Sequence, residues 1–125
     1  MPVETGLSAS VQIVVGDEDT AIAYRSGTVP VLATPRLVAL CEQASVQAVD
    51  GLLDEGSTTV GMRVQFDHLM PTSVGMPITV DATLEKVSGR RLTFTVSATD
   101  HRGLVAAGKV TRVIVDVERF LEKAR

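Results

Sequence analysis

The chain of 125 residues carries a net charge of −3 at neutral pH and is 45% hydrophobic, which fits one globular domain over residues 1–125 with roughly two-thirds of its unfolded surface buried. The acidic balance argues against a nucleic-acid partner, and no apolar run reaches the ~18 residues of a membrane span. A single cysteine excludes an internal disulfide, and the chain opens without a basic and then apolar leader, so we expect a cytoplasmic protein.

The first thirty residues predict a strand and a loop. Residues 9–15 alternate apolar and polar side chains as a half-buried strand does, and the polar turn 16–19 ends it. The short run Thr20 to Tyr24 is expected to continue the strand. Glycine and proline then predict a loop over residues 26–30.

A long apolar helix follows this loop. Thr34 can cap the first free amides, and Pro35 suits the first helical position because its missing N–H costs nothing there. From Leu37 onward the apolar positions form an almost continuous surface. With Gly56 as the C-terminal cap, the helix covers residues 35–55 and measures about 30 Å.

The second half of the chain predicts four strands, at residues 57–69, 76–87, 90–100 and 104–117. Ser88-Gly89 and residues 100–103 read as hairpin turns between the later strands. Clean alternation from Ile78 to Leu84 assigns one buried face to this region. The economical packing is an α+β fold, in which a curved antiparallel sheet wraps around the long helix.

Glu42, His68 and Thr34 are the candidates for chemistry. A carboxylate among apolar helical neighbours is a plausible base, because desolvation raises its pKa; alternatively, Glu42 lies on a solvated stripe. An imidazole titrates near neutral pH, although a strand-end histidine can simply bond a carbonyl group. Capping alone explains Thr34, and about 12 Å of helix separates it from Glu42.

Other polar and reactive positions have simpler explanations beside the functional one. Cys41 reads as a packing residue, and His101 lies in a turn and receives no role. Gly61 either lets backbone approach a ligand or permits a bulge. Arg90 and Arg91 are candidate contacts for phosphate groups, or solvated residues at a strand start. The histidines lack the spacing of a metal site.

Three segments resemble the fluoroacetyl-CoA thioesterase group of the hot-dog fold. They read A-T-P-R-L-V-A-L-C-E-Q-A from Ala33, G-M-R-V-Q-F-D-H-L-M-P-T-S-V-G from Gly61 and V-S-G-R-R-L-T-F-T-V-S-A from Val87. The resemblance implies a hot-dog fold and assigns thioester hydrolysis to Thr34, Glu42 and His68, with Gly61 nearby. The stretch between Tyr24 and Thr34 lacks the family's phenylalanines, so the resemblance implies an acyl-CoA thioesterase without specifying the acyl group.

We therefore expect hydrolysis of a small acyl-CoA thioester, with coenzyme A as part of the substrate and no separate cofactor. Glu42 and His68 assist the attack of water, Thr34 positions the substrate, and Arg90 and Arg91 bind phosphate. The resemblance also implies a homodimer or a tetramer, since hot-dog sites commonly lie between subunits. Two alternatives stay open: a non-catalytic acyl-CoA or small-ligand binding protein, and a hydratase or dehydratase of the same fold.

Overall fold

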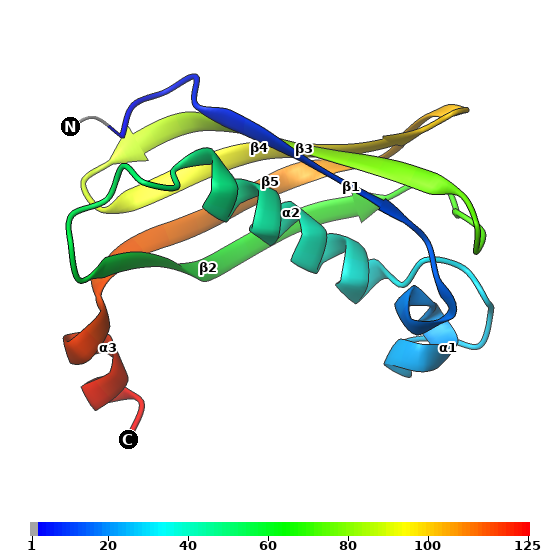
Figure 1. The fold of residues 1–125 in the computed structure, drawn as a ribbon, viewed down its shortest axis with the longest axis horizontal. Helices are drawn as coiled ribbons and strands as arrows, with labels where there is room; N and C mark the ends of the chain where they lie inside the picture. Colours follow the sequence, from blue (N-terminus) through cyan, green and yellow to red (C-terminus); the bar gives the residue numbers. More distant parts are fainter. Residues whose placement is uncertain (1–2) are drawn as a thin grey trace.

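A computed structural model describes residues 3–125, in which a five-stranded antiparallel sheet packs against one principal helix (Figure 1). The elements in chain order are β1 (Ser8–Val14), the 3₁₀ turn η1 (Asp17–Asp19), α1 (Ala21–Tyr24), α2 (Thr34–Ala48), β2 (Ser57–His68), β3 (Pro77–Ser88), β4 (Arg91–Asp100), β5 (Gly103–Asp116) and α3 (Val117–Lys123). No helix among the described residues is long and apolar enough to cross a membrane.

The sheet has the strand order β1-β3-β4-β5-β2, and α2 lies across one of its faces (Figure 1). The core forms where the buried face of β3 and β4 meets the apolar side of α2. Leu37, Leu40 and Ala44 of the helix are fully buried there, as is Phe94 of β4. This arrangement confirms the expected sheet around a central helix, and it places β1 and β2 at the two edges.

The four later strands match their predicted positions to within one residue at each end. Their alternation survives in the structure: Ile78, Val80, Ala82 and Leu84 are all buried, whereas Glu85 and Lys86 are exposed. Periodicity sufficed here because each of these strands buries a single face.

The central helix is shorter than predicted. It ends at Ala48 with Val49 as its C-cap, so its 15 residues measure about 22 Å. The chain then turns through Gly51 at φ 78°, a left-handed conformation that glycine adopts without steric cost. Gly56 also has a positive φ but immediately precedes β2. The prediction chose the wrong glycine, because Leu52 continued the apolar pattern beyond the true end.

Two further helices correct the predicted elements. Residues 21–24 form α1 and not a continuation of the strand, since the Thr20 hydroxyl accepts a hydrogen bond from the Ala23 N–H and caps the turn. At the other end of the chain, α3 begins after Asp116, whose carboxylate accepts from the Arg119 N–H at 3.1 Å. An aspartate N-cap is a recognisable helix signal that the strand reading of residues 104–117 overlooked.

Candidate active site

The start of α2 and the end of β2 meet through two predicted site residues. Thr34 Oγ1 lies 2.8 Å from His68 Nδ1. Thr34 is the first residue of the helix. Ala33 occupies the N-cap position, and its methyl side chain cannot accept a hydrogen bond from the first N–H groups of the helix. The expectation that Thr34 caps the helix is therefore wrong. Its hydroxyl is directed to the histidine instead, an interaction across 34 positions of sequence that local patterns do not indicate.

Thr34 and His68 lie on the wall of a cavity of about 330 Å³. Most of the other lining residues are apolar: Ala21, Gly27, Val29, Val31, Leu32, Leu69, Met70 and Pro71, with Ser26 as a further polar member. The volume falls at the small end of the range for ligand pockets. This open, mainly apolar cavity, with a threonine and a histidine on its wall, has room for a small acyl group.

The surroundings of His68 favour its neutral imidazole and leave one ring nitrogen without a partner in the described part of the chain. Burial lowers the pKa of its imidazole, and the neighbouring Met70 backbone partly opposes this. Burial therefore favours the neutral form of the ring. With Nδ1 engaged by Thr34, the other nitrogen, Nε2, is buried and has no hydrogen-bonding partner among residues 3–125.

Glu42 is half-buried, with a side chain 34% exposed, and it pairs with an arginine that was not predicted as a site residue. Its Oε2 lies 3.0 Å from Nη1 of Arg112 on β5. Arg112 donates further hydrogen bonds to the hydroxyl and carbonyl oxygens of Thr59, at 3.0 and 2.8 Å. Burial lowers the pKa of the Arg112 guanidinium, and the Glu42 carboxylate opposes this only in part. The missed signal was a lone arginine on the buried side of a strand, where an unpaired charge is costly.

Gly61 lies directly against the Glu42 carboxylate. A β-carbon at position 61 would overlap Glu42 Oε2 and would lie 3.5 Å from Arg112 Nη1. The β2–β5 register also shifts between Gly61 and Arg63. The register shift agrees with the bulge considered for this glycine, and the missing side chain leaves room for the Glu42 carboxylate.

The site residues thus form two groups within one chain, Thr34 with His68 and Glu42 with Arg112. Cys41, next to Glu42 in the chain, is fully buried, and burial together with the Glu42 charge raises the pKa of its thiol to about 12. This confirms a packing role and removes Cys41 as a nucleophile. His101 lies in the exposed β4–β5 turn as expected.

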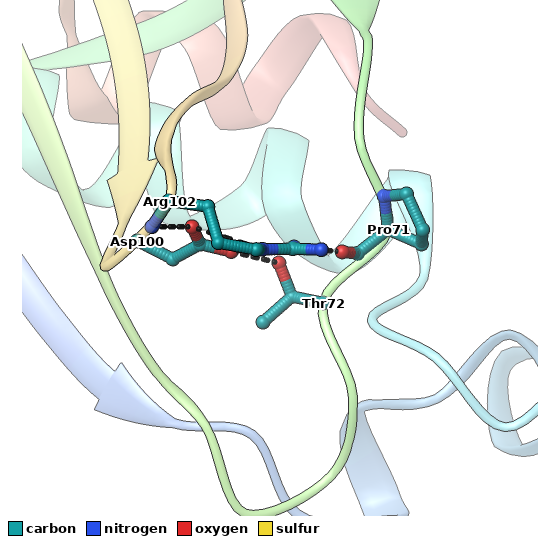
Figure 2. A network of polar contacts seen from close by, with 4 residues as sticks. All are labelled: Pro71, Thr72, Asp100 and Arg102. Carbon is teal, nitrogen blue, oxygen red and sulfur yellow. Dashed lines mark hydrogen bonds and ion pairs between the residues drawn. The ribbon is translucent and has the colours of Figure 1, made fainter.

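The loop between β2 and β3 is anchored on both sides of the Thr34–His68 pair. Figure 2 shows Arg102 bridging Asp100 and the Pro71 carbonyl oxygen, with the Thr72 hydroxyl donating to Asp100. Hydrogen bonding from Arg102 is the main reason that the pKa of Asp100 falls to about 2. On the other side of the loop, the Thr72 carbonyl oxygen accepts a hydrogen bond from the Leu32 N–H at 2.9 Å. The network therefore links the segment after His68 to the segment before Thr34.

Known thioesterases resemble this chain in sequence and in fold. The model of the fluoroacetyl-CoA-specific thioesterase family FlK matches residues 15–118. A fluoroacetyl-CoA thioesterase from Streptantibioticus cattleyicolor is 36% identical over 76% of this chain and 68% of its own length. A solved structure of FlK superposes with a TM-score of 0.92 at 30% identity, covering 100% of this chain and 97% of that one. A thioesterase superfamily member from Thermus thermophilus has a TM-score of 0.88 at 30% identity, covering 98% and 93%. The chain is a hot-dog protein and belongs to the fluoroacetyl-CoA-specific thioesterase family.

Proposed function

We propose that the protein hydrolyses a small acyl-CoA thioester to the free acid and coenzyme A, with no cofactor beyond the coenzyme A of the substrate. The observation that carries this proposal is the 2.8 Å Thr34–His68 contact on the wall of a small, mainly apolar cavity. Membership of a thioesterase family supports the same reaction. The cavity size favours a short acyl chain.

In the proposed reaction, the oxygen of a water molecule attacks the thioester carbonyl carbon while Glu42 accepts the water's proton. The carbonyl π electrons move to its oxygen, which backbone amides near Gly61 or the start of α2 stabilise. His68 Nε2, which has no partner within residues 3–125, accepts a hydrogen bond from the attacking water and orients it. The C–S bond then breaks, and the departing thiolate takes the proton that Glu42 accepted, which restores the carboxylate. Thr34 holds the imidazole through Nδ1 and positions the substrate carbonyl.

We further propose that the two groups of site residues meet across a homodimer. β2 is an edge strand, and its residues 61–65 are exposed, including Met62 and Val64. An unpaired edge of this kind can pair with a second copy of itself. Antiparallel pairing centred between Val64 and Gln65 places Gly61 opposite the partner's His68. Glu42, which lies against Gly61, then faces the pair formed by the partner's Thr34 and the partner's His68.

The reaction is tested by following free-thiol release from acyl-CoAs with short, branched, aryl and halogenated acyl groups. We expect one class to be hydrolysed, and Glu42→Ala and His68→Ala each to lower turnover by about a hundredfold or more while the fold is retained. His101→Ala is the matched control and should behave as wild type. Binding of acyl-CoA without thiol release would identify a ligand-binding protein. Conversion of an enoyl or hydroxyacyl group instead would identify a hydratase or dehydratase.

The dimer arrangement is tested by combining the two inactive variants. A purified heterodimer of Glu42→Ala and His68→Ala carries both lesions in one shared site and none in the other. We therefore expect about half of the wild-type activity per heterodimer. If every site were built from one chain, each would carry a lesion and the heterodimer would stay inactive, which would contradict the shared site without affecting the proposed reaction.

A further inference from the structure

The carboxylate of Asp19 is a buried charge outside the candidate active site. Asp19 is the last residue of η1, and its side chain is only 8% exposed. Its Oδ2 accepts a hydrogen bond from the Gly16 N–H at 2.8 Å, and its Oδ1 accepts one from Nε of Arg36, also at 2.8 Å. Such pairing is what makes a buried carboxylate tolerable. The ion pair with Arg36 joins the turn after β1 to the helix α2.

Arg36 is a cation at the end of a helix where positive charge is disfavoured. It lies in the first turn of α2, next to the positive end of the helix dipole. That turn contains no acidic residue, and the N-cap Ala33 makes no side-chain hydrogen bond to it. Asp19 therefore supplies, from another part of the chain, the negative charge that stabilises a helix at this end.

Backbone hydrogen bonds lie beside the ion pair. The carbonyl oxygen of Asp19 accepts from the Ala33 N–H at 2.9 Å, and the Ala21 N–H donates to the Val31 carbonyl oxygen at 2.8 Å. The segments before α1 and before α2 thus lie side by side, and they close the loop that contains α1 (Figure 1). Because backbone atoms make these contacts, they persist when the Asp19 side chain is changed, and the carboxylate can be tested by itself.

The ion pair lies next to the Thr34–His68 contact. Arg36 and Thr34 belong to the same turn of α2, and Thr34 Oγ1 lies 2.8 Å from His68 Nδ1. A hydrogen bond weakens steeply when its partners move apart or lose their alignment, so this contact requires a fixed first turn. On the other side of the pair, Ala21 follows Asp19 by two residues and lines the same cavity as Thr34. The pair therefore connects two segments that form the wall of the cavity.

We propose that Asp19 is a positioning residue: through Arg36 it fixes the first turn of α2, so that the Thr34 hydroxyl stays on His68. Asp19 does not line the cavity, and it acts only through the helix. The inference rests on the proposed function, because it assigns Asp19 a part in thioester hydrolysis. The Thr34–His68 contact on which it depends can be observed without any substrate.

The first test is kinetic. Asp19→Asn removes the charge but keeps the size of the side chain and an oxygen that can accept the Gly16 N–H. We expect kcat on the best thioester substrate to fall by about tenfold, because a small displacement of a positioning group is costly to the rate. Arg36→Gln should cause a similar fall, and Arg36→Lys, which keeps the charge, a smaller one. The matched control is Asp17→Asn, an exposed acid of the same turn with no ion pair in the range 3–125, which should behave as wild type.

A double-mutant cycle separates positioning from a general loss of stability. Thr34→Val removes the hydroxyl with little change in shape, and with it the group on which Asp19 is proposed to act. Adding Asp19→Asn to this variant should therefore lower kcat no further. A fall by the same factor as in the wild-type background would show that Asp19 acts independently of Thr34, and it would overturn the proposal. Thermal unfolding followed by circular dichroism checks that each variant is folded at the assay temperature.

The second test needs no substrate. The chain has two histidines, so the nitrogen NMR signals of both imidazoles can be assigned, with His101 in the β4–β5 turn as an internal reference. Asp19→Asn should shift the His68 Nδ1 signal in the same direction as Thr34→Val does, and leave His101 unchanged. An unchanged His68 signal in Asp19→Asn would overturn the proposal. The expected shift in a protein that hydrolyses no thioester would uphold the link from Asp19 to His68 and contradict the proposed reaction.

Discussion

The contact between Gly61 and Glu42 makes position 61 sensitive to a single methyl group. In Gly61→Ala the new β-carbon would overlap Glu42 Oε2. The flexible carboxylate would have to shift, which disturbs its 3.0 Å ion pair with Arg112. We therefore expect kcat to fall by about tenfold or more, since a displaced base no longer reaches the water. Steady-state kinetics with circular dichroism as a check on folding measures this, and unchanged kcat would argue against Glu42 as the base.

The burial of His68 predicts an unusual pH dependence. The reaction as proposed needs a neutral imidazole before water attacks. Because burial lowers the pKa of His68, the neutral form persists to lower pH than in an exposed histidine, whose pKa is about 6.5. The acid limb of the kcat/KM profile should therefore lie below that value. An acid limb above it would show that another group controls the rate.

The loop network around Arg102 acts at the scale of a structural element. Arg102→Ala removes both the support of Pro71 and the partner of Asp100, whose side chain is 1% exposed. The loop that carries Met70 into the cavity should loosen, which raises KM and lowers the thermal midpoint by several degrees. Arg25→Lys, a conservative change at another exposed arginine, should change neither value.

The same network has a testable pH signature. The pKa of Asp100 in the fold, about 2, lies below the value of about 3.9 for an unfolded aspartate. Its stabilising contribution is thus present above about pH 4 and is lost as the pH falls toward 2. Denaturant unfolding of wild type and Arg102→Ala should converge over this interval. A constant difference between them would contradict the role of Arg102.

How far the sequence predicts each element depends on whether its signals are local. Periodicity located β3 and β4 because their alternation reports burial directly, and the glycine and proline signals located the loop before α2. The prediction of where α2 ends was wrong, because Leu52 lies in a turn but still fits the helical pattern of apolar residues. The residues alone gave Thr34 a local role, capping, and only the resemblance grouped it with His68, its partner 34 positions away. Arg112 was missed for the same reason, since its partner Glu42 is 70 positions distant.

At the scale of the whole molecule, the two edges of the sheet permit a matched test of assembly. Val64→Glu places a charge in the middle of the exposed β2 edge, and Val14→Glu places the same charge at the exposed end of β1 on the opposite edge. Light scattering should show a monomer for the first variant and a dimer for the second, with activity lost only in the first. A dimeric Val64→Glu variant would place the subunit contact elsewhere.

The burial of Cys41 bears on how the protein tolerates its own proposed product. Coenzyme A is a thiol, and its oxidised forms exchange with accessible protein cysteines through the thiolate. The only cysteine of this chain is fully buried and has a pKa of about 12, so it stays protonated and out of reach of a disulfide. The folded molecule is thereby protected against mixed-disulfide formation, however much thiol it releases.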